Sequence, residues 1–338
     1  MTPEVLAAWQ EALPNQRVQC LLCPHHCMLP DGRTGLCKTR INRSGRLFST
    51  SYGKLCALGV DPIEKKPLYH FFPGMGILSM ATAGCTFRCV NCQNWTISQQ
   101  PPEAVPWKGY TPEEVVERAL FEGVDSLAFT YTEPTVFYEF MLETARLARE
   151  KGLKSVLISN GYINQAPLEA LCDVLDAANI DVKAFDETTY RMLTGGHLQP
   201  VLDTLRTLKD RGVWLEMTQL VIPGLSDDTD KAAAFYKQLV DLGFADTPLH
   251  LSRFFPQYRL TDKQATPPET LEALAHVAEE AGFKYVYLGN LQDRGGEDTR
   301  CPACRHLLVG RRGYLVHTYR MKDGHCPNCG VPVAGRWY

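Results

Sequence analysis

The chain has 338 residues, 45% of them hydrophobic and 22% charged, with a formal net charge of −3. This length supports a sizeable core with small appended units, and the charge gives no electrostatic preference for nucleic acid or membrane surfaces. No run of about 18 apolar residues occurs and the first residues lack a secretory signal, so we expect a cytoplasmic protein without membrane-spanning helices. Thirteen cysteines in such a chain indicate metal binding rather than disulfides.

The first predicted element is a short amphipathic helix over residues 3–13, because apolar residues recur there at helical spacing. A cysteine-rich stretch with the spacing C-x₂-C-x₃-C-x₉-C follows, and it supplies four soft ligands separated by Pro and Gly turns. We expect a structural zinc here; an auxiliary iron–sulfur cluster and the absence of any metal are the alternatives. Residues 45–55 are expected to form a small hairpin. The four cysteines are Cys20, Cys23, Cys27 and Cys37.

An apolar run over residues 76–82 predicts a buried strand, and three more cysteines lie on the loop that follows it. Cys85, Cys89 and Cys92 have the spacing C-x₃-C-x₂-C, which fits neither a zinc ribbon nor a two-cysteine redox pair. Three thiolates can hold three irons of a [4Fe–4S] cube and leave the fourth iron open. The alternatives are three unrelated thiols or a zinc site. Loops at the C-terminal ends of strands are where α/β barrels carry their chemistry.

From residue 111 onward, helical segments alternate with short apolar runs. Thr111 and Glu114 form a predicted capping box, and Pro112 occupies the first helical turn. Such alternation predicts an α/β fold with a parallel sheet and right-handed crossovers, here a partial (β/α)6 TIM-like barrel. The expected strands are 126–130, 155–159, 179–182, 214–222, 249–254 and 285–288. The expected helices are 136–151, 168–177, 200–211, 229–242 and 268–281.

Polar residues follow several of these strands, at the edge where a barrel presents its site. For Asp181 and Lys183 the alternative is a structural ion pair. His70 precedes the first barrel strand among aromatic residues, which is more typical of a buried, hydrogen-bonded histidine than of an acid or base. The strand-end residues expected to bind a ligand are Thr132, Glu133, Ser159, Asn160, Asp181, Lys183 and His250.

The C-terminal cysteines form two C-x₂-C pairs separated by 21 residues, with a predicted hairpin over residues 307–316 between them. This spacing predicts a zinc ribbon, because each tight turn brings two thiolates to one tetrahedral ion; an electron-relaying iron–sulfur cluster is the alternative. So short a unit needs the metal to fold. The predicted domains are 1–50, 51–295 and 296–338, with a linker at 295–298. The ribbon cysteines are Cys301, Cys304, Cys326 and Cys329.

The three-cysteine motif resembles that of the radical S-adenosylmethionine (radical SAM) enzymes, although Asn91 stands where that family usually has an aromatic residue. Across almost its full length the chain resembles the AmmeMemoRadiSam-system radical SAM proteins, often labelled pyruvate formate-lyase activase-like. The motifs that carry this resemblance occur at 20–27, 84–95, 132–135, 220–224 and 301–330.

The resemblance implies a [4Fe–4S] cluster whose open iron binds SAM, with Thr132 and Glu133 near the methionyl amino group. Asp181 and Lys183 then lie near the ribose and carboxylate. Memo-like and AMMECR-like proteins are the implied partners, and a flavodoxin or ferredoxin is the expected electron donor. We therefore expect a radical SAM enzyme that abstracts hydrogen from an unidentified substrate. The alternatives are an activase that makes a glycyl radical on a partner protein and a non-catalytic metal-binding scaffold.

Overall fold

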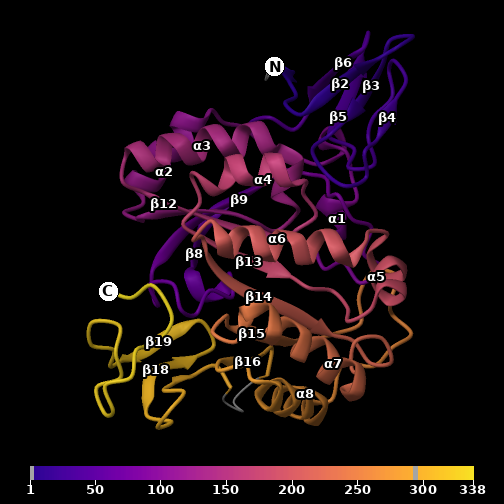
Figure 1. The fold of residues 1–338 in the computed structure, drawn as a ribbon. Coiled ribbons are helices and arrows are strands. Elements are labelled where there is room, and N and C mark those ends of the chain that lie inside the picture. The colour runs from indigo at the N-terminus through magenta and orange to yellow at the C-terminus, as the bar shows by residue number, and fades with distance from the viewer. Residues whose placement is uncertain (1–3, 292–295) are drawn as a thin grey trace.

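The computed structural model of the chain describes residues 4–291 and 296–338, and its centre is one eight-stranded sheet (Figure 1). Seven strands are parallel and follow one another across the sheet in chain order, as in TIM-like α/β folds, whereas β8 pairs antiparallel with β9 at one edge. Among the described residues β8 and β16 do not pair, so the sheet is open. In sheet order the strands are β8 (Ala57–Pro62), β9 (Gly76–Ala81), β11 (Ser126–Phe129), β12 (Lys154–Ser159), β13 (Ala177–Asp181), β14 (Trp214–Val221), β15 (Leu249–Arg253) and β16 (Val286–Gly289).

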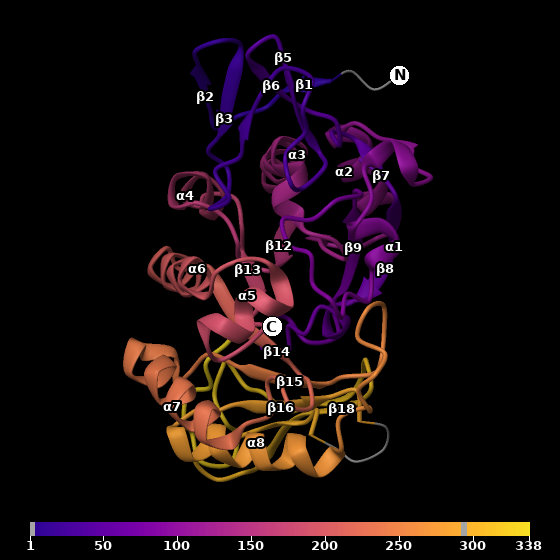
Figure 2. The ribbon, with the colours of Figure 1, turned by 90° about the vertical axis from the view of Figure 1, so that its right-hand side faces the viewer.

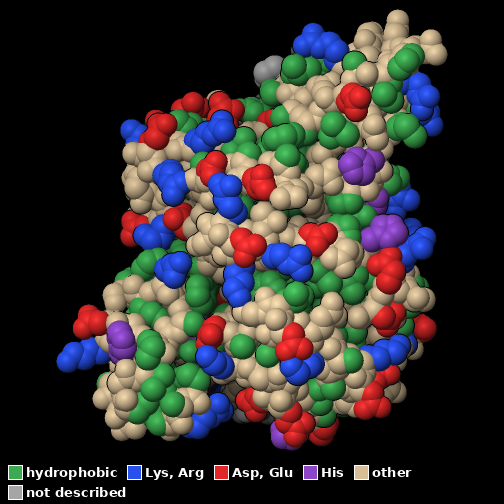
Figure 3. Space-filling model, viewed as in Figure 1, with side chains coloured by type: hydrophobic (Ala, Val, Ile, Leu, Met, Phe, Trp, Pro, Cys, Tyr) green, Lys and Arg blue, Asp and Glu red, His purple; other side chains and the backbone are tan. Residues whose placement is uncertain are grey.

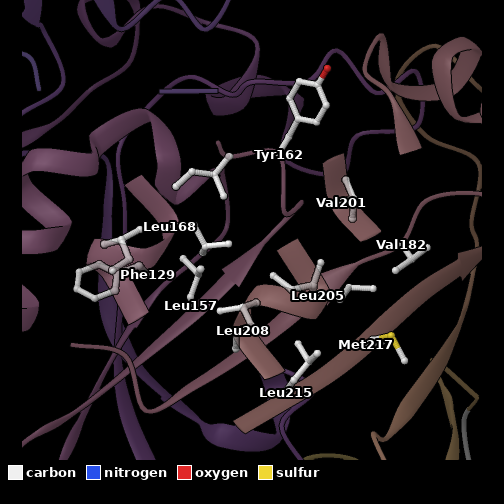
Figure 4. Packing of buried hydrophobic residues seen from close by; sticks show 14 of the residues in the cluster. Phe129, Leu157, Tyr162, Leu168, Val182, Val201, Leu205, Leu208, Leu215 and Met217 are labelled. Atoms are coloured by element: carbon white, nitrogen blue, oxygen red, sulfur yellow. The ribbon is translucent and has the colours of Figure 1, made fainter. Parts of the chain in front are cut away.

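Helices connect the parallel strands and cover one side of the sheet (Figures 1 and 2). Their apolar faces pack on the sheet through buried side chains such as Leu157, Leu205 and Met217 (Figure 4). The capping box of Thr111 and Glu114 is confirmed at the start of α2. The helices are α1 (Trp95–Ser98), α2 (Pro112–Phe121), α3 (Tyr138–Glu150), α4 (Gln165–Cys172), α5 (Glu187–Thr194), α6 (Leu198–Asp210), α7 (Thr229–Leu239) and α8 (Pro268–Ala281), with shorter helical turns at Ile63–Lys65, Pro102–Ala104, Pro134–Phe137 and Val240–Phe244.

The N-terminal unit consists of two small antiparallel sheets that lie at one end of the molecule (Figure 1). Arg40 anchors it to the central domain, because its buried guanidinium pairs at 2.6 Å with Glu139 of α3, whose side chain is 10% exposed. A further two-stranded pair joins β7 (Lys54–Leu55) to β10 (Lys108–Gly109). The strands of the unit are β1 (Val5–Leu6), β5 (Arg40–Arg43) and β6 (Arg46–Ser49) in one sheet, and β2 (Gln10–Leu13), β3 (Arg17–Cys20) and β4 (Met28–Leu29) in the other.

The C-terminal unit is a three-stranded antiparallel sheet of β17 (Thr299–Arg300), β18 (Leu307–Arg312) and β19 (Leu315–Tyr319). It packs on the central domain through a buried apolar cluster that includes Tyr285, Tyr287 and Val333. The predicted hairpin between the cysteine pairs is confirmed by the pairing of β18 with β19.

The central strands and most helices lie where the sequence predicts them, but three predicted elements are wrong. Residues 3–13 contain strands β1 and β2 instead of a helix, because Trp9 has a φ of 59° and Gln10–Leu13 pairs with Arg17–Cys20. The N-terminal hairpin joins β5 to β6 instead of spanning 45–55, since Ser44 and Gly45 both have positive φ and form its turn. The helix predicted over 168–177 ends at Cys172, and Ala177 already belongs to β13.

The α/β class with a parallel sheet is confirmed, while the six-unit partial barrel and the three domain boundaries stay predictions. Residues 3 and 295, which bound two predicted segments, lie outside the described residues. Within residues 4–291 and 296–338 no helix is long and apolar enough to cross a membrane. On the face shown in Figure 3, acidic and basic side chains are interspersed over the helices instead of forming a patch of one sign.

Candidate active site

The three-cysteine loop leaves the C-terminal end of β9 and is held on two sides. Gly84 has a φ of 101°, and its amide donates to the carbonyl of Ile97 in α1 at 3.0 Å. On the other side, the amides of Arg88 and Val90 donate to carbonyls at the end of α5, at 2.8 and 3.0 Å. α1 and α5 therefore hold the backbone around the cysteines at the end of the sheet.

The thiols of Cys85, Cys89 and Cys92 are all half-buried and unbridged. Cys85 Sγ accepts from the Phe87 amide at 3.3 Å, and Cys92 Sγ lies 3.1 Å from the Ser98 hydroxyl. The structure does not bring these three sulfurs within 4.8 Å of one another, as it does the ribbon sulfurs. Three thiolates on one loop can each hold a different iron of a cubane cluster and leave the fourth iron open.

Glu133 ties the ends of β11 and β12 together beside this loop. One carboxylate oxygen accepts from the Ser159 hydroxyl at 2.8 Å, and the other accepts from the Asn160 amide at 2.9 Å. Burial raises the pKa of Glu133 although Asn160 and Thr135 donate to it. The Asn160 side chain in turn donates to the Thr86 hydroxyl at 2.9 Å. Three predicted site residues, Glu133, Ser159 and Asn160, are therefore joined to the cysteine loop in one hydrogen-bonded network.

Thr132 belongs to the same edge of the sheet, because its hydroxyl donates to the carbonyl of Thr82 at 2.7 Å. The preceding residue, Tyr131, has a φ of 63°, and its carbonyl accepts from the side chain of Asn94 at 2.5 Å. Asn94 was not among the predicted site residues. Its place two positions after Cys92 was the signal in the sequence that could have identified it.

Asp181 and Lys183 form an ion pair at 2.6 Å, and both side chains are partly exposed. Val182 between them is buried in the core under the helices (Figure 4), so the two charged side chains point to the opposite side of the strand. Burial lowers the pKa of Lys183, but the charges of Asp181 and of the nearby Cys89 outweigh it and raise that pKa overall. Lys183 therefore lies close to the cysteine loop as a retained positive charge.

The structure does not bring His250 into this network. His250 Nε2 lies 2.6 Å from a carboxylate oxygen of Glu216, and its ring packs edge-on against Tyr69. Glu216 is fully buried and also accepts from the amides of Tyr69 and His70 at 3.0 and 2.7 Å. His250 and Tyr69 line a cavity between the central sheet and the C-terminal unit. The role of Glu216 was not predicted from the sequence, because its partners Tyr69, His70 and His250 are more than thirty positions away in the chain.

The two other cysteine sets are both assembled by the fold. All four N-terminal cysteines line one cavity. In the C-terminal unit, Cys301 Sγ lies 3.5 Å from Cys329 Sγ and Cys304 Sγ lies 3.7 Å from Cys326 Sγ. All four ribbon sulfurs lie within 4.8 Å of one another, which is the arrangement that a single tetrahedral metal ion requires.

Comparison with known proteins identifies the family of the central domain. The sequence profile of the radical SAM superfamily matches residues 80–236, which include the three-cysteine loop, the Glu133 network and the Asp181–Lys183 pair. Residues 80–236 of the chain therefore form a radical SAM domain. Such a domain implies a [4Fe–4S] cluster and SAM binding, and the three thiols of the loop lie within it.

Three relatives match most of the chain or its central domain. Protein MJ0808 of Methanocaldococcus jannaschii is 46% identical over 329 residues, which cover 97% of this chain and 98% of that protein. The pyruvate formate-lyase 1-activating enzyme of Escherichia coli strain K12 is 22% identical and covers 60% of this chain and 89% of its own length. The pyruvate formate-lyase-activating enzyme of Staphylococcus aureus is 27% identical over a stretch that covers 63% of this chain and 89% of that enzyme.

Proposed function

We propose that this protein is a radical SAM enzyme whose active site is the loop after β9. The observation that carries the proposal is the joining of the three-thiol loop to the strand-end network through Thr86, Asn160 and Glu133. Cys85, Cys89 and Cys92 would hold the cluster. When bound, such a cluster supplies the electron and the open iron with which SAM is cleaved, giving a 5′-deoxyadenosyl radical that abstracts hydrogen from a substrate.

The strand-end residues would bind and orient SAM. Lys183 presents a cation to the methionyl carboxylate, and Asp181 presents an anion to the amino group or the ribose hydroxyls. Glu133 already accepts hydrogen bonds from Ser159 and the Asn160 amide, so it positions these two residues and the loop above them. Thr132 fixes the neighbouring turn. A direct contact between His250 and SAM remains a prediction, because its partner in the structure is Glu216.

The substrate and the partners belong to the proposal as well. We propose that the enzyme acts with Memo-like and AMMECR-like proteins and receives its electron from a flavodoxin or ferredoxin. An activase that generates a glycyl radical on a partner protein is the second candidate, favoured by the similarity to pyruvate formate-lyase-activating enzymes. Incubation of the reduced enzyme and SAM with pyruvate formate-lyase, followed by electron paramagnetic resonance, tests that candidate through the signal of a glycyl radical.

The first test removes one of the three thiols. Cys89→Ala should abolish the formation of 5′-deoxyadenosine from SAM by anaerobically reconstituted, reduced protein, measured by mass spectrometry. Cys172→Ala is the matched control, since Cys172 is a buried thiol on α4 outside all three cysteine sets. Full SAM cleavage by the Cys89→Ala protein would contradict the proposal. Wild-type protein that never cleaves SAM would favour a metal-binding scaffold.

A second test separates SAM binding from cluster ligation. Lys183→Met removes a charge-assisted contact of about 1.5–3 kcal/mol, so SAM affinity should fall roughly tenfold to a hundredfold. The cluster and the fold should be retained. The measurement is a SAM titration that follows the visible spectrum of the reconstituted protein, with Lys151→Met, at the exposed end of α3, as the control. An unaltered affinity would show that Lys183 serves only as the partner of Asp181.

A further inference from the structure

The N-terminal unit contains a cavity whose wall holds all four cysteines of its cysteine-rich stretch. Cys20 and Cys23 are buried, whereas Cys27 and Cys37 are half-buried. Gly35 lies between the two outer thiols, and a Cβ added there would lie 3.7 Å from Cys37 Sγ and 3.8 Å from Cys27 Sγ. The absence of a side chain at Gly35 therefore leaves the space next to these sulfurs open.

The spacing of these sulfurs differs from that of the ribbon. Four thiolates around one tetrahedral zinc lie about 3.8 Å apart, because each Zn–S bond is about 2.3 Å long. The ribbon meets this requirement, with its four sulfurs within 4.8 Å of one another. In the described part of the chain the N-terminal four do not form such a group, although they line one cavity. Thiols that surround a cavity at wider spacing suit a polynuclear cluster, in which each cysteine holds a different iron.

A buried cation on the cavity wall lacks one hydrogen-bond acceptor. Arg40 lines the cavity and is 1% exposed. Its two terminal nitrogens donate to the Ala8 carbonyl at 3.1 Å and to the Glu139 carboxylate at 2.6 Å. Its Nε has no partner in the described structure, which is costly for a buried donor. On the same wall, the Thr39 hydroxyl donates to Cys37 Sγ at 3.3 Å. A sulfur-rich, anionic ligand in the cavity would supply the acceptor that Arg40 lacks.

We propose that this cavity holds an auxiliary [4Fe–4S] cluster ligated by Cys20, Cys23, Cys27 and Cys37. This assignment replaces the zinc that the sequence favours at these cysteines, and it keeps zinc for the ribbon. The site itself does not depend on the proposed radical SAM activity, because iron and sulfide content report it directly.

The position of the cavity gives the auxiliary cluster a role in electron delivery, and this part does rest on the proposed function. Thr86 lines the cavity and is the residue next to Cys85, and its carbonyl lies 2.8 Å from His25 Nε2. A Cβ on Gly84 would lie 2.7 Å from the carbonyl oxygen of Cys37, so the two cysteine loops are in direct backbone contact. A reduced flavodoxin or ferredoxin would give one electron to the auxiliary cluster, which would pass it to the cluster at Cys85 and return to its oxidised state.

The site is tested by metal analysis of a protein without the active-site thiols. The Cys85→Ala/Cys89→Ala/Cys92→Ala protein, reconstituted anaerobically with iron and sulfide, should retain about four irons and four sulfides per chain, together with zinc at the ribbon. Adding Cys27→Ser should remove this iron, and adding Cys304→Ser should remove only the zinc. A triple variant that binds zinc at both ends and no iron would overturn the proposal, as would iron that survives Cys27→Ser.

Two further measurements keep the result decisive. If the triple variant does not fold, wild-type protein should contain two clusters, and Cys27→Ser alone should lose one of them; a single cluster in the wild type would overturn the site. For the relay, Cys27→Ser in the otherwise intact chain should lose SAM cleavage driven by reduced flavodoxin but keep cleavage driven by dithionite. Equal activity with both reductants would overturn the relay while leaving the metal assignment intact.

Discussion

The two ends of the molecule each carry four cysteines on small antiparallel sheets, yet the sulfurs are arranged differently. The C-terminal sulfurs converge within 4.8 Å, and the unit packs on the central domain through its own apolar cluster. The N-terminal sulfurs surround a cavity that is partly walled by Thr86, Thr135 and Val136 of the central domain. The ribbon sulfurs thus form a candidate metal site within that unit, whereas the N-terminal cavity is completed by the domain that carries the candidate active site.

This difference predicts what a bound metal would do at each end. A closed four-thiolate site leaves no position for substrate and contributes folding energy. A site whose wall includes the residue next to Cys85 would place a bound cofactor beside the proposed chemistry. Each unit is also anchored by one buried arginine, Arg40 on Glu139 and Arg311 on Glu64. Comparing the consequences of disrupting each end therefore separates a structural metal from a functional one.

The largest effect is expected from removing the ribbon metal. Cys326→Ser should forfeit on the order of 10 kcal/mol of metal-linked folding free energy, comparable with the whole stability of a typical domain. The ribbon should unfold and expose the aromatic side chains of Tyr285 and Tyr287, which pack against it. Thermal unfolding with parallel zinc analysis measures this, and Cys56→Ser is the control. An unchanged unfolding midpoint would show that the unit is stable without metal.

The two buried arginines should give the next largest effect. They compare directly the interfaces that the N-terminal and C-terminal units form with the central domain. Arg311→Met leaves Glu64 buried and unpaired, which costs about 3–5 kcal/mol. Both side chains of that pair are fully buried. Arg40→Met should cost less, because Glu139 is 10% exposed and can be partly hydrated. Urea unfolding of the reconstituted variants measures the difference, with the exposed Arg320→Met as control. A larger loss of unfolding free energy for Arg40→Met would contradict this ranking of the two interfaces.

Local patterns in the sequence were sufficient to place the parts of the site that are close in the chain. The C-x₃-C-x₂-C spacing, the strand before it and the polar residues after β11 and β12 are all local, and the structure joins them in one network. The capping box at Thr111 is local as well. Short amphipathic segments were ambiguous, and residues 3–13 were wrongly predicted as a helix because two short strands around a turn at Trp9 can carry the same apolar spacing.

Contacts between distant segments could not be predicted in this way. Arg311 pairs with Glu64 across 247 positions, and His70 Nδ1–H donates to the carbonyl of Ala334 across 264 positions. No periodicity or spacing in the sequence encodes such pairs, because they arise only when the C-terminal unit packs on the sheet. The metal at Cys20, Cys23, Cys27 and Cys37 was undecided for a similar reason: the spacing in the chain fits several metals, and the cavity exists only in the folded protein.

The smallest predicted effect is a dependence of stability on pH. It arises at the interface between the C-terminal unit and the central domain. His70 is fully buried there, with Nδ1 2.6 Å from the carbonyl of Ala334 and Nε2 2.5 Å from the hydroxyl of Tyr287. A neutral imidazole satisfies both contacts, because Nδ1–H donates to the carbonyl and Nε2 accepts from the tyrosine. Burial lowers the pKa of His70 from 6.5 to about 4.

The sign of the pH effect follows from this lowered pKa. Between pH 6.5 and about pH 4 the unfolded chain binds a proton at His70 that the folded chain does not, so stability should decline as the pH falls through this window. The full loss is about 3 kcal/mol, at about 1.4 kcal/mol for each pKa unit. Denaturant unfolding at several pH values measures it. His70→Gln should flatten the dependence in this window, whereas the exposed His276→Gln should not; an unchanged slope in His70→Gln would assign the acid sensitivity to another group.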